Sequence, residues 1–193
     1  DISIAEEETL LILGDSISAG YGINKKDNWV YLMQQKFYEE GNSIKLINSS
    51  VSGDTTGGGL GRLAKNLKKF KPDFVLIELG GNDALRGYSI KLIKSNLEKM
   101  IALIKQNKSK VLLMQIRIPP NYGQKYMLAF EKIYKDLALS EEVYLMPFML
   151  EEIGINSELM QPDGIHPNKK AQSLIAKDVK KNIDKFLLIN QSN

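Results

Sequence analysis

Residues 10–47 read LLILGDSISAGYGINKKDNWVYLMQQKFYEEGNSIKLI, and this stretch predicts the first strand–helix–strand unit of the chain. The apolar run at residues 10–13 ends at Gly14 and predicts a buried strand. Residues 29–40 then predict a helix, and residues 44–47 predict a second strand. A strand followed by a helix and another strand indicates a parallel βαβ unit.

The same alternation of short apolar runs and longer amphipathic stretches continues along the chain. Three more runs predict strands at residues 74–77, 111–118 and 143–146, and amphipathic stretches predict helices at 60–70, 90–105, 126–139 and 169–188. Continuous apolar strands are buried on both faces, so we expect an α/β fold whose parallel sheet carries helices on both sides. No linker or repeat divides residues 1–193, so we expect one domain, with flexible tails at residues 1–8 and 187–193.

Composition excludes several classes of protein. The chain is 43% hydrophobic and 25% charged, which is typical of a globular domain. The 26 basic and 23 acidic residues leave a net charge of only +3, so we expect no nucleic-acid partner. The chain has no cysteine, which excludes thiol catalysis, disulfides and metal sites built from cysteine. It has one histidine, which excludes zinc sites built from several imidazoles. No apolar run approaches the ~20 residues of a membrane span.

The single histidine, His166, lies in the segment Pro162-Asp163-Gly164-Ile165-His166-Pro167, just before the last predicted helix. Asp163 precedes it by three residues, so in a turn its carboxylate can accept a hydrogen bond from the imidazole Nδ1–H. That bond would fix the tautomer and stabilise an imidazolium, as the acid of a catalytic triad does. An ordinary structural turn explains the same spacing equally well.

Ser16 is the candidate nucleophile. It follows the first predicted strand in the turn Gly14-Asp15-Ser16, where a hydroxyl can enter the crevice at the carboxyl ends of the strands. The alternative is a serine that only caps a helix N-terminus. The surrounding residues do not match the Gly-x-Ser-x-Gly elbow of α/β-hydrolases.

Gly53 and Asn82, which follow the second and third predicted strands, are candidate donors to an oxyanion. Gly53 has no side chain, so a substrate oxygen can come close to its N–H. Asn82, in Gly80-Gly81-Asn82-Asp83, offers a side-chain NH₂ group. Both residue types are also common in turns, which is the alternative interpretation for each.

These segments together resemble the GDSL, or SGNH, hydrolases. Residues 14–18 read Gly-Asp-Ser-Ile-Ser, similar to the Gly-Asp-Ser-Leu-Ser block of that family with isoleucine in place of leucine. The residues that give SGNH its name stand in order as Ser16, Gly53, Asn82 and His166, and Asp163 takes the place of the triad carboxylate. Residues 76–88, 113–123 and 160–168 resemble the bacterial multifunctional thioesterase I/protease I/lysophospholipase subgroup.

The resemblance implies a flavodoxin-like three-layer α/β/α sandwich around a five-stranded parallel sheet. It implies a triad of Ser16, Asp163 and His166, with the oxyanion held by the N–H groups of Ser16 and Gly53 and by the side chain of Asn82. It also implies that no metal or cofactor is used. The implied substrates are small acyl compounds, namely fatty acyl thioesters, lysophospholipids and aryl esters.

The acyl chain of such a substrate needs an apolar groove. Two predicted loops, residues 84–88 and 118–122, follow the third and fourth strands and carry the candidate side chains. The candidates are Leu85, Tyr88, Ile118, Pro120 and Tyr122. These segments are equally well explained as ordinary crossover loops.

Three other functions fit parts of the sequence. A carbohydrate acetyl esterase of the same superfamily would share the triad but would need a short, open acyl site. A nucleotide or phosphate binder would use the glycines of residues 53–62, although these lack the Lys-[Ser/Thr] ending of a phosphate loop. A non-catalytic relative that binds lipid would not need the intact triad residues.

The resemblance also implies a location, because the subgroup is typically exported to the periplasm. The chain begins at Asp1 without an initiator methionine, which agrees with a processed, periplasmic or secreted protein. A cytoplasmic location remains open. We expect the protein to act as a monomer.

Overall fold

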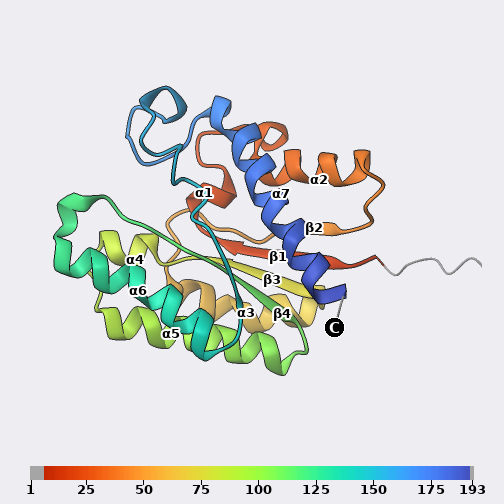
Figure 1. The fold of residues 1–193 in the computed structure, drawn as a ribbon, viewed down its shortest axis with the longest axis horizontal. Coiled ribbons are helices and arrows are strands. Elements are labelled where there is room, and N and C mark those ends of the chain that lie inside the picture. The colour runs from red at the N-terminus through yellow and green to blue at the C-terminus, as the bar shows by residue number, and fades with distance from the viewer. Residues whose placement is uncertain (1–6, 192–193) are drawn as a thin grey trace, which may run out of the picture.

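The computed structural model describes residues 7–191, and it forms a five-stranded parallel sheet between two layers of helices (Figure 1). The order of the strands is β2-β1-β3-β4-β5. The strands are β1 (Thr9–Gly14), β2 (Lys45–Asn48), β3 (Phe74–Glu78), β4 (Lys110–Met114) and β5 (Tyr144–Met146). This is the flavodoxin-like order, so the predicted fold class is confirmed.

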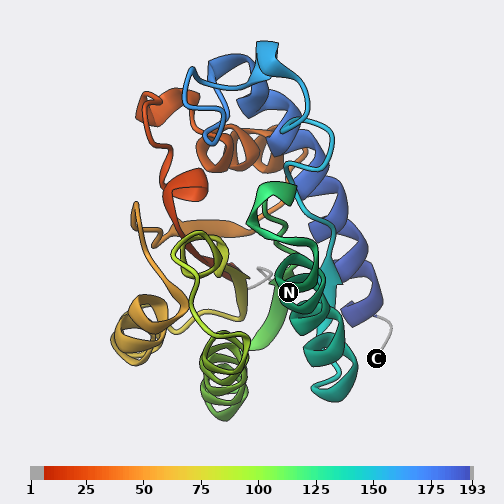
Figure 2. The same cartoon turned by 90° about the vertical axis from the view of Figure 1, so that its left-hand side faces the viewer.

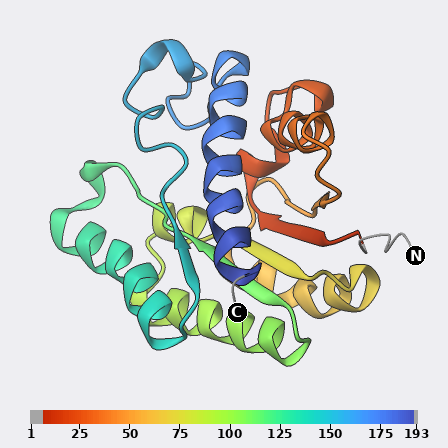
Figure 3. The same ribbon diagram turned by 45° about the vertical axis from the view of Figure 1, so that its right-hand side comes forward.

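Seven α-helices follow the strands within these residues. They are α1 (Ser16–Ala19), α2 (Trp29–Glu39), α3 (Thr56–Phe70), α4 (Gly81–Leu85), α5 (Ile90–Gln106), α6 (Gln124–Ser140) and α7 (Lys169–Gln191). Helix α2 packs against α7 on one face of the sheet, whereas α3, α5 and α6 form a layer on the other face (Figure 2). Figure 3 shows α7 running across its face of the sheet, next to β5.

The core lies on both faces of the two central strands. Every residue of β3 is buried, and β1 is buried from its second residue onward, which explains their unbroken apolar runs. Strand β1 pairs with both β2 and β3, so its carboxyl end lies between theirs. The loops after these three strands therefore meet at one edge of the sheet.

Several predicted boundaries differ from the structure. Strand β4 ends at Met114 rather than at residue 118, because its partner β5 ends at Met146. Helix α3 begins at Thr56 rather than at residue 60, since the Thr55 hydroxyl accepts a hydrogen bond from the Gly58 N–H at 3.1 Å. The short helices α1 and α4 were not predicted.

The two expected tails overlap the described residues in part. Residues 1–6 and 192–193 lie outside the described residues. The Glu8 carbonyl accepts a hydrogen bond from the Lys45 N–H at 2.7 Å, so the chain meets the edge of β2 just before β1 begins. At the other end, α7 continues through residues 187–191, and Leu187 is buried. None of the helices in the described part of the chain is long and apolar enough to cross a membrane.

Candidate active site

The predicted nucleophile, base and acid meet at the carboxyl edge of the sheet. Ser16 is the first residue of α1, directly after the turn that follows β1. Its Oγ lies 2.9 Å from Nε2 of His166. The other ring nitrogen of His166, Nδ1, lies 2.6 Å from Oδ2 of Asp163. Ser16, His166 and Asp163 thus form one continuous chain of hydrogen bonds, although 150 residues separate Ser16 from His166.

A tight loop between β5 and α7 holds Asp163 and His166 in this position. The loop closes where Met160 pairs with Pro167, and the Gln161 N–H donates to the His166 carbonyl at 2.8 Å. Within the loop, Oδ1 of Asp163 accepts hydrogen bonds from the N–H groups of Ile165 and His166 at 2.9 and 3.0 Å. One carboxylate oxygen therefore shapes the turn while the other orients the imidazole.

The electrostatics of Asp163 suit this task. The hydrogen bond from the His166 N–H, followed by the one from the His166 ring, lowers the pKa of Asp163 to about 2. The carboxylate is therefore ionised throughout the physiological pH range. An ionised carboxylate only accepts hydrogen bonds, so the neutral imidazole of His166 carries its proton on Nδ1 and presents an unprotonated Nε2 to Ser16.

Two further residues, which the sequence analysis did not single out, hold His166 and its loop in place. The ring of Tyr21 lies against the imidazole of His166, with 4.4 Å between the ring centroids. The side-chain NH₂ of Gln161 donates to the Tyr21 carbonyl at 2.8 Å and to the Pro167 carbonyl at 3.1 Å. Gln161 thus ties the histidine loop to the segment after α1. Only the flanking Gly20 and Gly22 hint at this turn in the sequence.

Gly53 and Ser16 both present backbone donors at this edge. Gly53 has a φ of 79°, a left-handed conformation that side chains other than glycine disfavour. The Gly53 carbonyl accepts a hydrogen bond from Arg86 at 3.1 Å, which holds the peptide between Gly53 and Asp54. Within residues 7–191, neither the Ser16 N–H nor the Gly53 N–H donates to a protein acceptor. Both are therefore available to a ligand oxygen.

Asn82 lies in α4, immediately after β3. Its Nδ2 donates to the Asp54 carbonyl at 2.9 Å and to Oδ2 of Asp15 at 3.3 Å. Since Asp15 precedes Ser16 and Asp54 follows Gly53, these two bonds bring the three predicted oxyanion donors to one place. The helix that carries Asn82 is preceded by its N-cap residue Gly80, where φ is 121° and a Cβ would lie 2.0 Å from the Tyr134 hydroxyl.

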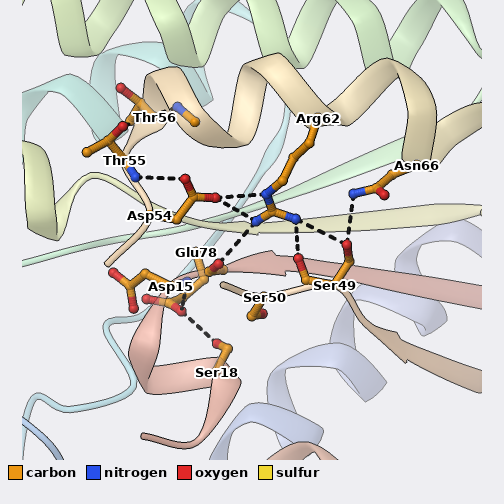
Figure 4. Close-up of polar contacts among 12 residues, drawn as sticks. Asp15, Ser18, Ser49, Ser50, Asp54, Thr55, Thr56, Arg62, Asn66 and Glu78 are labelled. Carbon is orange, nitrogen blue, oxygen red and sulfur yellow. Dashed lines mark hydrogen bonds and ion pairs between the residues drawn. The ribbon is translucent and has the colours of Figure 1, made fainter. Parts of the chain in front are cut away.

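Two buried carboxyl groups, those of Asp15 and Glu78, lie close to the start of α1 (Figure 4). Glu78, the last residue of β3, accepts hydrogen bonds from the Ser18 hydroxyl at 2.6 Å and from the Asp15 N–H at 3.4 Å. Burial raises the pKa of Asp15 to about 6, and burial together with the nearby Asp15 charge raises the pKa of Glu78 well above its usual value. Sequence analysis did not identify either residue as part of the site.

Arg62 of α3 connects the segments that contain Gly14, Ser49 and Asp54 (Figure 4). Its guanidinium binds the Asp54 carboxylate at 2.8 Å, the Ser49 carbonyl and hydroxyl, and the Gly14 carbonyl at 3.3 Å. A planar guanidinium with several donors can hold three loops in one arrangement. Arg62 therefore holds the side chain of Asp54, whose carbonyl accepts a hydrogen bond from Asn82.

The glycine-rich segment after β2 is arranged differently from a phosphate-binding loop. The carboxylate of Asp83 accepts hydrogen bonds from the Thr56 N–H at 2.8 Å and from the Thr56 hydroxyl at 2.5 Å. The first turn of α3 thus already faces the buried carboxyl group of Asp83. A phosphate placed there would meet that carboxylate, which argues against a nucleotide site at residues 53–62.

The expected acyl-groove residues lie in two segments that follow β3 and β4. Leu85 ends α4 and is half-buried, Ile118 is buried, and Tyr88 and Tyr122 are each 38% exposed. Pro120 begins the 3₁₀ turn Pro120–Tyr122 and is exposed. The two segments are linked through α6, because the Tyr126 hydroxyl donates to the Tyr88 carbonyl at 2.5 Å. A mostly apolar cavity of about 520 Å³ lies at the start of α6, and residues other than the five predicted ones line it.

Known proteins are similar to this chain in sequence and in fold. The chain is 49% identical to the arylesterase of Vibrio mimicus over 180 residues, covering 93% of this chain and 90% of that protein. It is 45% identical to thioesterase 1/protease 1/lysophospholipase L1 of Escherichia coli (strain K12) over 172 residues, covering 89% of this chain and 81% of that protein.

Solved structures agree with the sequence relatives. The psychrotrophic esterase EstA of Pseudoalteromonas sp., in a structure inhibited by monoethylphosphonate, superposes with a TM-score of 0.92 at 43% identity. That match covers 93% of this chain and 98% of EstA. The model of the GDSL-like lipase/acylhydrolase family matches residues 12–174. The chain therefore belongs to the GDSL-like lipase/acylhydrolase family.

Proposed function

We propose that this protein is a serine hydrolase that cleaves acyl esters and thioesters through an acyl-enzyme on Ser16. The observation that carries the proposal is the hydrogen-bonded series from Ser16 Oγ to His166 Nε2 at 2.9 Å and from His166 Nδ1 to Asp163 at 2.6 Å. A base within this distance of a hydroxyl, itself oriented by a carboxylate, is the arrangement that activates a serine nucleophile.

The proposed reaction has two halves. His166 accepts the Ser16 proton from Oγ as that oxygen attacks the acyl carbonyl, and Asp163 stabilises the resulting imidazolium. His166 then protonates the leaving alcohol or thiol. In the second half, His166 activates a water molecule, which releases the acid from Ser16 and restores the free hydroxyl. No other group has to gain or lose a proton.

The charge that develops on the carbonyl oxygen has three candidate donors. The N–H groups of Ser16 and Gly53 have no protein acceptor within the described residues, and Asn82 is bonded to the neighbours of both. Donors already oriented toward the developing charge lower the barrier, and the loss of one costs roughly 10²–10³ in kcat. We assign these three groups to the oxyanion hole.

We infer that the preferred substrates carry a medium or long acyl chain, as the family resemblance implies. The names of the relatives, an arylesterase and a thioesterase 1/protease 1/lysophospholipase L1, point to aryl esters, acyl thioesters and lysophospholipids. We place the alkyl chain along the two loop segments after β3 and β4. The side chains that we propose to contact it are Leu85, Tyr88, Ile118, Pro120 and Tyr122.

Hydrolysis of p-nitrophenyl esters from acetyl to palmitoyl, with acyl-CoA thioesters of the same lengths, tests the substrate class. We expect kcat/KM to rise from acetyl to the medium or long chains for both leaving groups. Highest activity on acetyl, with a steep fall beyond it, would instead favour a carbohydrate acetyl esterase. A folded protein that turns over none of these compounds would contradict the proposed reaction.

The cellular setting follows from the family resemblance and from the site. We infer a periplasmic enzyme of lipid metabolism, because the subgroup that the chain resembles is typically exported. We also infer that a monomer is active, since one chain supplies the triad and all three oxyanion donors. Fractionation of the native cells tests the first inference, and activity measured across a gel-filtration peak of known mass tests the second.

A further inference from the structure

The amide of Asn82 has no spare proton in the free protein. A side-chain amide nitrogen carries two hydrogens. In the structure one is directed to the Asp54 carbonyl at 2.9 Å and the other to Oδ2 of Asp15 at 3.3 Å. If Asn82 donates to an oxyanion, one of these two bonds must be given up. The longer bond, to Asp15, is the weaker of the two and is the one that can be exchanged.

The same two acceptors determine which way the amide faces. The Asp54 carbonyl can only accept a hydrogen bond, and so can an ionised Asp15 carboxylate. Rotation of the Asn82 amide by 180° would place its oxygen against both of these oxygens. The NH₂ end is therefore kept at the site, and Asp54 alone would hold only one of its two protons.

Asp15 is itself firmly held. Its Oδ1 accepts a hydrogen bond from the Ile17 N–H at 3.0 Å, and its own N–H donates to Glu78 at 3.4 Å. The side chain is 5% exposed, and Glu78 in turn is fixed by the Ser18 hydroxyl at 2.6 Å. Oδ1 of Asp15 is occupied by the Ile17 N–H, and Oδ2 of Asp15 accepts the hydrogen bond from Asn82. Asp15, the residue directly before Ser16, thus contacts the proposed oxyanion donor Asn82.

We propose that Asp15 is a positioning residue that holds the Asn82 amide in its donating orientation and releases one N–H to the oxyanion during the reaction. This inference rests on the proposed function, since it requires that Asn82 be an oxyanion donor. Asp15 does not touch the substrate in this scheme. Its effect passes through Asn82, so the two residues must act as one unit.

The test is a double-mutant cycle between Asp15→Asn and Asn82→Ala, measured on a medium-chain p-nitrophenyl ester. Asparagine is also a good N-cap residue, so Asp15→Asn can keep the bond from Ile17 and the start of α1. Its NH₂ would then meet the NH₂ of Asn82 and disturb the amide. We expect kcat to fall roughly 10–10²-fold with little change in KM, which is part of the loss of a full oxyanion donor.

Non-additivity decides the outcome. Asn82→Ala alone should lower kcat roughly 10²–10³-fold, and adding Asp15→Asn to that variant should lower it less than about threefold further. Equal effects of Asp15→Asn with and without Asn82 would overturn the inference. So would a change confined to KM. Asp15→Ser, which also caps a helix, provides the same comparison if Asp15→Asn folds poorly.

Two further variants separate this inference from the proposed function. Ser16→Ala must abolish turnover; if it does not, the proposed function fails, whatever the cycle shows. Asp136→Asn is the matched control, because Asp136 is a half-exposed carboxylate of α6 that pairs with Lys132. Its activity should equal that of the wild type. A Ser16-dependent enzyme in which Asp15 and Asn82 act independently would overturn the positioning role alone.

Discussion

Asp163 shows how one side chain can build a turn and orient a base. Its two oxygens accept three hydrogen bonds, two from backbone N–H groups and one from the imidazole of His166. The spacing of Asp163 and His166 in the sequence predicted that the carboxylate reaches Nδ1, and the structure confirms that contact. Neither the second oxygen's role in the turn nor the stacking of Tyr21 on the imidazole followed from the spacing.

Asp163→Asn tests the orienting role. Asparagine can keep the acceptor for the two backbone N–H groups, but its NH₂ would face Nδ1 of His166. The imidazole would then carry its proton on Nε2, where it cannot accept the Ser16 proton. We expect kcat to fall about 10⁴-fold, the size of this effect in a serine protease triad, with little loss of stability. A loss of less than tenfold, measured on the same ester as the wild type, would contradict this role.

The residues around the nucleophile were the least predictable part of the site. Asp15, Glu78 and Arg62 are charged residues in or beside apolar runs, and their type alone does not reveal whether they are buried. Their positions depend on the register of β1 against β3, which places Gly14 beside Glu78. That register is a long-range property. The residues of the proposed triad could therefore be named from local motifs together with the family resemblance, whereas the contacts around them could not be predicted.

At the level of elements, the length of each strand depends on its neighbour. The apolar run at residues 111–118 predicted a strand of eight residues, but β4 pairs with β5 only as far as Met114 and Met146. The Gln115 N–H still donates to the Met146 carbonyl at 2.9 Å, after which the chain leaves the sheet. The helices α1 and α4 escaped prediction because helices of four and five residues carry no periodic pattern.

The start of α4 depends on close packing between Gly80 and Tyr134. A Cβ at Gly80 would lie 2.0 Å from the Tyr134 hydroxyl, and φ there is 121°. Gly80→Ala should lower the free energy of unfolding by about 3 kcal/mol, through both overpacking and the unfavourable φ. Because α4 carries Asn82, kcat should fall as well.

The Tyr134→Phe variant separates the two causes. Removal of the hydroxyl takes away the clash but also the hydrogen bond to the Leu79 carbonyl at 2.8 Å, which costs about 1 kcal/mol by itself. In urea unfolding, we expect the double variant to be more stable than the sum of the single losses predicts. Strict additivity would show that the backbone conformation alone makes glycine necessary at this position.

Across the whole molecule, the buried carboxyl pair links stability to pH. Burial raises the pKa of Glu78 well above its ordinary value of 4.5, so the folded protein retains a proton that the unfolded chain releases. Stability must therefore fall as pH rises from about 4.5 toward the folded pKa. Asp15 acts in the same direction between 3.8 and about 6. Ser18 and Asp15 are the groups that contact Glu78 directly.

Glu78→Gln tests this linkage. Glutamine can keep an acceptor for the Ser18 hydroxyl but has no proton to lose. Relative to the wild type, the variant should therefore gain stability as pH rises from 5 to 8, by at most ~1.4 kcal/mol per pH unit. Urea unfolding at several pH values measures the difference, with Glu98→Gln, at a half-exposed carboxylate of α5, as the control. A difference that stays constant or falls with rising pH would show that Glu78 is ionised in the folded protein.

In the proposed reaction, Ser16 becomes covalently modified. The most direct measurement is to incubate the protein with an activated ethylphosphonate ester and to locate the added mass by peptide mapping. We predict one phosphonate per chain, on Ser16, with matching loss of esterase activity and no labelling of Ser16→Ala. Labelling of another residue, or turnover that persists in Ser16→Ala, would contradict the claim.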